Sequence, residues 1–221
     1  MGMDALSPHR ESNTLEHGVA LNEAAGAVIL LHGRGASAED ILMLGEHLRL
    51  ARVALFAPQA TSHSWYPNSF LAPIENNEPW LTSALELIDH LVGRCHTAGI
   101  SSERLVIAGF SQGACLASEF VARYPRRYGA VLAFTGGLVG PLGSDLHHAG
   151  KLLGTPVLLS SGDPDPHVPW SRVEETASQL TAMGAKVRVE RYPGRPHTVL
   201  PEELQIARDF LRAFFPPSEV S

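Results

Sequence analysis

The sequence is poor in cysteine, has no long apolar run and carries no excess of basic residues. Its two cysteines, Cys95 and Cys115, are too few for a disulfide framework or a four-thiolate zinc site. No apolar run approaches the ~18 residues that a membrane-spanning helix needs, which argues against stable membrane insertion. Against 23 Asp and Glu residues stand 17 Lys and Arg, and this net charge of −6 disfavours a nucleic-acid partner, because phosphate binding needs a basic face.

What remains is the composition of one folded domain. In a chain of 221 residues, 44% are hydrophobic and 18% are charged, which argues against a disordered chain. We expect a single domain over residues 1–221, with loose tails at about 1–14 and 216–221. The first 24 residues lack the apolar core of a secretory signal, and Leu6 replaces the Ser or Thr that a myristoylation site needs. These features predict a cytoplasmic protein. A monomer or a homodimer is expected, and the sequence does not decide between the two.

Short apolar runs alternate with amphipathic stretches along the chain. The run from Ala27 to Leu31 has no polar alternation, which is typical of a strand buried on both faces of a parallel sheet. Predicted strands lie at residues 27–31, 53–57, 105–108, 131–134, 157–159 and 187–192, and predicted helices at about 38–50, 81–91, 112–123, 171–183 and 202–215. This order predicts an α/β fold, with a mostly parallel central sheet flanked by helices on both faces. Such sheets bind ligands in the loops beyond the carboxyl ends of their strands.

A G-x-S-x-G motif follows the third predicted strand, as Gly109-Phe110-Ser111-Gln112-Gly113. A serine on a sharp turn between strand and helix needs very small residues two positions before and after it. The helix that follows is also rich in small residues, which fits close packing behind the turn. The motif predicts Ser111 as a nucleophile, and the alternative is an inert serine in a tight turn.

A serine hydroxyl needs a base, and the base needs an acid to orient it. After the strand at 157–159 comes a segment with Asp163 and Asp165, and after the strand at 187–192 comes His197. The order Ser, Asp, His is that of α/β-hydrolases, so His197 is the predicted base. Spacing alone leaves open which aspartate orients it.

Two backbone amides are candidates for stabilising the oxyanion that forms during acyl transfer. One belongs to Gln112, the residue after the nucleophile, and the other to Arg34 in the Gly-rich turn after the first predicted strand. His32 in the same turn is a weaker candidate for the catalytic histidine. It precedes the serine in sequence, and the turn serves to shape the backbone.

These segments together resemble the phospholipase/carboxylesterase family of α/β-hydrolases, which includes bacterial carboxylesterases and acyl-protein thioesterases. The shared segments are Leu-His-Gly-x-Gly at 31–35, Ala57-Pro58 followed by Ser64-Trp65, the serine motif, Gly-Asp-x-Asp-Pro at 162–166 followed by Val168-Pro169, and His197. The resemblance implies an α/β-hydrolase fold and hydrolysis of a small-molecule ester without metal or cofactor. It also implies that Asp165 orients the histidine and that Asp163 belongs to the turn.

The sequence departs from this family at two places. The thioesterase branch usually has Leu where this chain has Arg34, which predicts a polar entrance and a preference for short- to medium-chain or aromatic esters. The loop at 62–80 contains Trp65, Tyr66 and Phe70, which with Leu138 are the candidate substrate-binding residues. The alternative for these aromatic side chains is packing beneath a long loop.

Other activities and sites remain as alternatives. The same triad would serve a (lyso)phospholipase or an acyl-thioesterase, whereas a non-catalytic binding protein is disfavoured because every triad residue and motif glycine is present. The histidines show no metal-ligand spacing, so they are expected on the surface, His167 among them. Cys115 is expected to be buried and inert.

Overall fold

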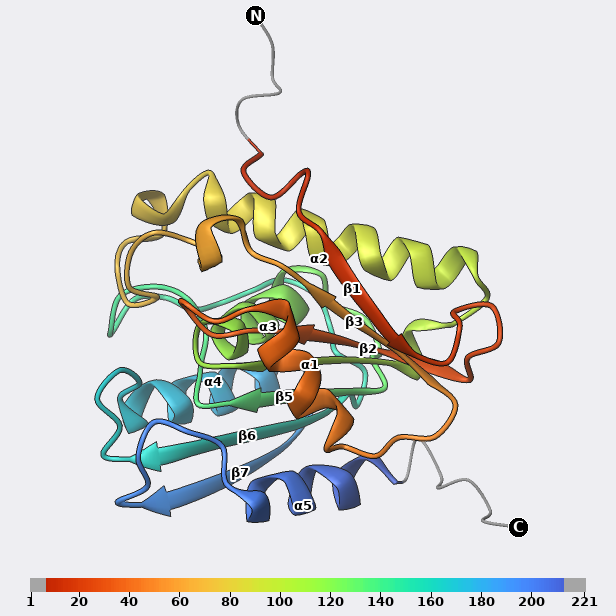
Figure 1. The fold of residues 1–221 in the computed structure, drawn as a ribbon. Coiled ribbons are helices and arrows are strands. Elements are labelled where there is room, and N and C mark those ends of the chain that lie inside the picture. The colour runs from red at the N-terminus through yellow and green to blue at the C-terminus, as the bar shows by residue number, and fades with distance from the viewer. Residues whose placement is uncertain (1–6, 213–221) are drawn as a thin grey trace, which may run out of the picture.

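The computed structural model describes residues 7–212 and is built on one seven-stranded sheet. The strands lie in the order β1-β3-β2-β4-β5-β6-β7 (Figure 1). Strand β1 pairs antiparallel with β3, and the other neighbouring pairs are parallel. The strand bounds are β1 Thr14–Gly18, β2 Gly26–Leu31, β3 Val53–Pro58, β4 Leu105–Phe110, β5 Ala130–Phe134, β6 Pro156–Asp163 and β7 Lys186–Pro193.

The central strands are buried on both faces, and their side chains divide the interior into two cores. Every residue of β2 is buried. Because successive strand residues point to opposite faces, Ile29 and Leu31 pack into one core, and Val28 and Leu30 into the other. The uninterrupted apolar runs of the sequence reflect this burial on two sides.

Helices cover both faces of the sheet. Helices α2, α3 and α4 pack in the core that contains Ile29, and α1 and α5 pack in the core that contains Val28 (Figure 1). Their bounds are α1 Ala38–Glu46, α2 Trp80–Thr97, α3 Gln112–Arg123, α4 Trp170–Ala182 and α5 Pro201–Leu211. The predicted α/β fold with a mostly parallel sheet is confirmed. Helix α1 ends earlier than predicted, and positions 213–215 of the last predicted helix lie outside the described residues.

The prediction of a loose amino-terminal tail is wrong for residues 7–14. His9 is fully buried, its Nε2–H donates to the Trp65 carbonyl (2.9 Å), and its Nδ1 accepts from the amide of Thr61 (3.2 Å). Its own amide donates to Ser83 Oγ (2.8 Å), so the segment is fastened before β1 begins. The other predicted tail, 216–221, lies outside the described residues.

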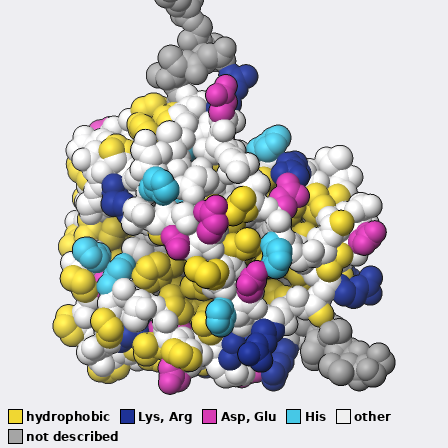
Figure 2. Space-filling model, viewed as in Figure 1, with side chains coloured by type: hydrophobic (Ala, Val, Ile, Leu, Met, Phe, Trp, Pro, Cys, Tyr) yellow, Lys and Arg dark blue, Asp and Glu magenta, His cyan; other side chains and the backbone are white. Residues whose placement is uncertain are grey.

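The outer surface is mixed in character. Figure 2 shows acidic, basic and histidine side chains interspersed with apolar ones on the face that carries α1 and α5. Between residues 7 and 212, no helix combines the length and the apolar character needed to cross a membrane.

Candidate active site

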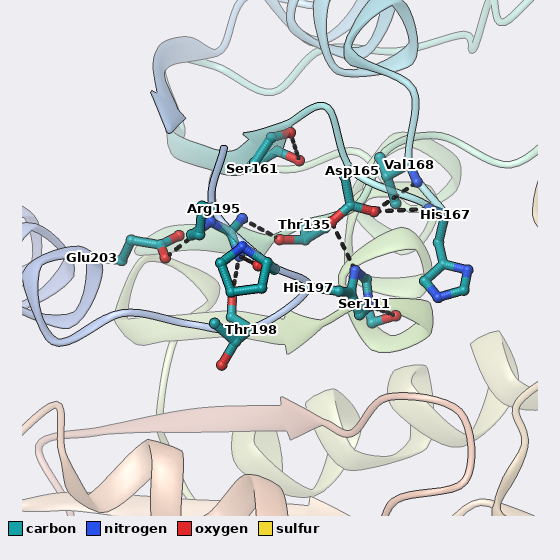
Figure 3. A network of polar contacts seen from close by, with 12 residues as sticks. Ser111, Thr135, Ser161, Asp165, His167, Val168, Arg195, His197, Thr198 and Glu203 are labelled. Carbon is teal, nitrogen blue, oxygen red and sulfur yellow. Dashed lines mark hydrogen bonds and ion pairs between the residues drawn. The ribbon is translucent and has the colours of Figure 1, made fainter. Parts of the chain in front are cut away.

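Three candidate side chains follow the carboxyl ends of three strands. Ser111 comes directly after β4, Asp165 two residues after β6, and His197 four residues after β7. Because these strands are parallel, their carboxyl ends meet at one edge of the sheet. The structure brings the three side chains into hydrogen-bond contact there (Figure 3).

Ser111 stands on a strained turn between β4 and α3. Its φ of 55° and ψ of −118° lie outside the regions that L-residues ordinarily adopt. A Cβ on Gly113 would lie 2.0 Å from the Leu31 carbonyl oxygen, and a Cβ on Gly109 would lie 2.3 Å from the Gly113 oxygen. Both glycines of the motif are therefore required by backbone approaches that no side chain would tolerate.

The three side chains form one chain of hydrogen bonds. The Ser111 hydroxyl lies 2.8 Å from His197 Nε2, and His197 Nδ1 lies 2.8 Å from Asp165 Oδ2. A carboxylate only accepts, so Nδ1 carries the proton and Nε2 accepts from the serine hydroxyl. This is the tautomer in which an imidazole acts as a base toward the serine.

Asp165 is held in its charged form. Its Oδ1 accepts from the amides of His167 (2.9 Å) and Val168 (3.0 Å). Burial works against the charge, but the His167 amide, the His197 imidazole and the Val168 amide outweigh it, so the pKa of Asp165 lies below its ordinary value. Asp163 instead accepts from Arg191 Nε (2.8 Å). Of the two aspartates, it is Asp165 that contacts the histidine.

Two rings pack against the His197 imidazole. The Phe110 ring lies 5.1 Å from it and the His167 ring meets it edge-on at 4.8 Å, measured between ring centroids. His167 is exposed, as predicted, and lies at the rim of the site.

A buried arginine anchors the loop that carries His197. Arg195 donates from Nη2 to Thr135 Oγ1 (2.6 Å) and from Nη1 to the Thr198 carbonyl, and its Nε lies 3.4 Å from Glu203 at the start of α5 (Figure 3). Glu203 in turn accepts from the Leu200 amide (2.8 Å). Sequence reasoning missed this network, because nothing in the pattern distinguishes a buried arginine from an exposed one.

The two candidate oxyanion donors lie near the serine. A Cβ on Gly33 would lie 3.4 Å from the Ser111 Cβ, so the turn that contains Arg34 packs against the nucleophile. Within residues 7–212, the backbone amides of Arg34 and Gln112 have no protein acceptor. The Gln112 side chain points to the neighbouring loop, where Nε2 donates to the Tyr66 carbonyl (2.8 Å).

A cavity of about 470 Å³ opens beside Ser111 and His197. The loop at 66–70, the Arg34 turn and the segment after β6 supply most of its wall. Its lining residues are Arg34, Tyr66, Pro67, Asn68, Ser69, Phe70, Ser111, Gln112, Cys115, His167, Val168 and His197. Sequence reasoning missed the contribution of Asn68, which belongs to no motif, and it placed Val168 in a segment shared with the family but not in the cavity wall.

Two of the four predicted substrate-binding residues line this cavity and two do not. Tyr66 and Phe70 are in its wall. Trp65 is fully buried, and its Nε1–H donates to the His32 carbonyl (2.8 Å), so it packs beneath the loop instead. Leu138 is also fully buried away from the cavity lining. The predictions for Trp65 and Leu138 are wrong, because large apolar side chains were needed in the core.

The other reactive side chains offer little chemistry. Burial raises the pKa of the Cys115 thiol to about 12, so the thiol stays protonated at neutral pH. In the described part of the chain, no three His, Cys, Asp or Glu side chains gather closely enough to hold a metal ion.

Known proteins resemble this chain in sequence and in fold. The family model for phospholipase/carboxylesterase matches residues 19–215. Acyl-protein thioesterase 1 of Eremothecium gossypii is 30% identical over 208 residues, covering 85% of this chain and 87% of that protein. A shorter match to acyl-protein thioesterase 1 of Gibberella zeae, 32% identical over 122 residues, covers 54% of this chain and about half (52%) of that relative.

A solved structure extends the likeness to three dimensions. The crystal structure of a phospholipase/carboxylesterase from Dyadobacter fermentans superimposes with a TM-score of 0.88 at 45% identity, covering 91% of this chain and 96% of that one. The family model covers nearly all of the sheet, the serine motif and the His197 loop. The chain belongs to the phospholipase/carboxylesterase family of α/β-hydrolases.

Proposed function

We propose that the protein is a serine hydrolase that cleaves carboxylic esters through Ser111, His197 and Asp165. The observation that carries the proposal is the hydrogen-bond chain from Asp165 through His197 to Ser111, with both links at 2.8 Å, beside an open cavity. Family membership supports it, because the relatives include proteins named carboxylesterase and acyl-protein thioesterase.

In the first half of the reaction, Ser111 Oγ attacks the ester carbonyl carbon and its proton passes to His197 Nε2. The carbonyl oxygen becomes an oxyanion, and the amides of Arg34 and Gln112 are the donors proposed to hold it. His197 then gives its proton to the alkoxide oxygen as the bond between carbonyl carbon and alkoxide oxygen breaks. The alcohol leaves, and the acyl group remains esterified to Ser111.

In the second half, water repeats the attack on the acyl-enzyme. His197 takes a proton from the water, and the new tetrahedral intermediate releases the acid as Ser111 recovers its proton. Asp165 keeps the imidazole oriented and stabilises its positive charge in both halves. The low pKa of Asp165 suits this role, since the carboxylate stays charged when the imidazole is protonated.

The expected substrates are short- to medium-chain or aromatic esters. The cavity is about 470 Å³ and is lined by polar as well as aromatic residues, so a long acyl chain would meet polar groups along with apolar ones. A second candidate is acyl-thioester hydrolysis, favoured by the acyl-protein thioesterases of Eremothecium gossypii and Gibberella zeae among the relatives. Cytoplasmic location and the monomeric or dimeric state remain predictions.

The test combines active-site labelling with substitution of the nucleophile. We expect a fluorophosphonate probe to label the wild type at Ser111, and Ser111→Ala to abolish labelling and lower kcat about 10⁴- to 10⁶-fold. Its circular dichroism spectrum should match the wild type, because the lost hydroxyl leaves almost no cavity. A Ser111→Ala enzyme that keeps a tenth of wild-type turnover would exclude this mechanism.

A panel of esters and thioesters then separates the two candidate activities. p-Nitrophenyl esters from acetate to palmitate and matched acyl thioesters would be compared by kcat/KM. A maximum at short or aromatic oxygen esters supports the first candidate. A steady rise toward palmitoyl thioesters supports the second.

A further inference from the structure

Among the described residues, the positive charge of Arg34 at the cavity has no acidic partner. Arg34 is exposed and lines the cavity, and its guanidinium forms no ion pair within residues 7–212. Its acceptors are three neutral oxygens: Nη1 donates to Ser64 Oγ (3.0 Å) and the Pro67 carbonyl (2.9 Å), and Nη2 donates to the Asn68 carbonyl (2.6 Å). These bonds fix the guanidinium in the wall without neutralising it.

The bonds that fix Arg34 do not use all of its N–H groups. A guanidinium has five N–H groups, and three are used here, both on Nη1 and one on Nη2. In the described part of the chain, Nε–H and one N–H of Nη2 are therefore left without a protein acceptor. An arginine whose N–H groups are not all used can bind a carboxylate through charge-assisted hydrogen bonds.

The rest of the cavity lining supplies no negative charge to Arg34. No Asp or Glu is among its lining residues. The Tyr66 hydroxyl is completely buried beside the Cys115 thiol, so it presents no donor to a ligand in the cavity. The cavity is therefore suited to a ligand that brings oxygen acceptors and negative charge.

We propose that this cavity selects esters whose acyl group ends in a carboxylate, with Arg34 as the residue that binds that carboxylate. The substrate class is the half-ester of a short dicarboxylic acid, and the ester carbonyl reaches Ser111 while the free carboxylate meets the remaining N–H groups of the guanidinium. The inference rests on the proposed function and adds a specificity-determining residue to it.

The test compares charged and neutral substrates of equal length. Monobenzyl esters of succinic, glutaric and adipic acid carry the carboxylate, and the corresponding benzyl ester amides replace it by a neutral primary amide of the same shape. Release of benzyl alcohol would be measured by chromatography at one pH and low salt. We expect the acid to exceed its amide in kcat/KM by about tenfold at the best chain length, as for one charge-assisted contact in a half-open cavity.

Two substitutions of Arg34 separate charge from structure. Arg34→Gln removes the charge, and we expect the acid-to-amide ratio to fall to about one. Arg34→Lys keeps the charge but loses the planar guanidinium with its several N–H groups, and we expect it to retain an acid-to-amide ratio of about threefold. The readout is the ratio within each variant, because both substitutions also disturb the bonds to the 64–68 loop and so the overall rate. High salt should lower the ratio in the wild type and not in Arg34→Gln.

A wild-type ratio near one at all three lengths would overturn the inference. So would a ratio that Arg34→Gln leaves unchanged. Both results leave the proposed function intact as long as the neutral benzyl ester amides are hydrolysed and Ser111 is labelled. Failure of the proposed function would look different, since neither acid nor amide would then be cleaved.

Discussion

At the scale of single residues, the site separates two aspartates that the sequence places two positions apart. Asp165 accepts from His197 and from two backbone amides, whereas Asp163 accepts from Arg191. A triad acid needs both the contact to imidazole and donors that keep it charged. Only Asp165 has both, and this agrees with the role that the family resemblance implied for it.

The first residue-scale prediction concerns these two aspartates. Asp165→Asn should lower kcat about 10⁴-fold, because an amide cannot hold the imidazole in the tautomer that accepts the serine proton. Asp163→Asn is the matched control. It weakens only a partly exposed pair with Arg191, so we expect kcat within a few-fold of wild type and a loss of unfolding free energy of about 1 kcal/mol or less. Steady-state kinetics and urea unfolding would be measured on both variants. A larger loss of kcat for Asp163→Asn than for Asp165→Asn would show that Asp165 is not the triad acid.

At the scale of elements, the sequence predicts what depends on local pattern and misses what depends on contacts. The parallel strands can be predicted from the sequence because burial on two faces requires uninterrupted apolar runs, as in β2. Strand β1 has no such run: it lies at the sheet edge, half-exposed and polar, and exists because it pairs with β3. His9 is equally hidden from sequence reasoning, since its burial depends on partners more than 50 positions away.

The candidate site follows the same division. The triad could be predicted because its chemistry restricts residue type, order and position after a strand. The cavity wall could not, because a tryptophan in a loop has the same signature whether it faces a ligand or, like Trp65, the core. Arg34 was predicted at a polar entrance, and the structure places its side chain exposed at the cavity.

The element-scale prediction concerns the loop between β7 and α5. Arg195 and Glu203 are both almost fully buried and face each other at 3.4 Å. Glu203→Gln should lower the unfolding free energy by about 3 kcal/mol, because it leaves the buried guanidinium without a charged partner. Because Arg195 fixes the His197 loop, kcat should also fall about tenfold or more through misplacement of the imidazole, with a smaller change in KM.

A double variant separates the charge effect from lost packing. Arg195→Met combined with Glu203→Met removes both charges and keeps apolar bulk, so its unfolding free energy should exceed that of Glu203→Gln. Urea unfolding at pH 7.5 measures both. If the double variant is less stable than Glu203→Gln, the unpaired charge is not what destabilises Glu203→Gln, and the loop depends on other contacts of these side chains.

At the scale of the whole molecule, neutral histidines join distant segments. His9 joins the amino-terminal segment to the loop after β3, and its Nδ1 accepts from a backbone amide. His32, after β2, does the same with Nε2, which accepts from the Ala60 amide (3.0 Å) while Nδ1–H donates to the Gly33 carbonyl (2.7 Å). Each ring must be neutral to accept, so protonation breaks a bond between elements.

The last prediction is that acid destabilises this fold from about pH 6.5 downward. Burial lowers the pKa of His9, His32 and His148 below the ordinary value of 6.5. Between each folded pKa and 6.5 the unfolded chain binds more protons, so the unfolding free energy is fully present above pH 6.5 and falls as the pH drops toward the folded values. Three such groups give a slope of up to ~4 kcal/mol per pH unit. The lowered pKa of Asp165 adds a loss of the same sign only below its ordinary value of 3.8.

Urea unfolding from pH 8 to 5.5 should show this dependence of the unfolding free energy on pH. The variant His9→Gln can still donate and accept, so its unfolding free energy should stay within about 1 kcal/mol of wild type at pH 8. Its slope with pH should be smaller by the equivalent of up to one proton. An unfolding free energy that stays constant over this range would contradict the neutral, buried state of these histidines.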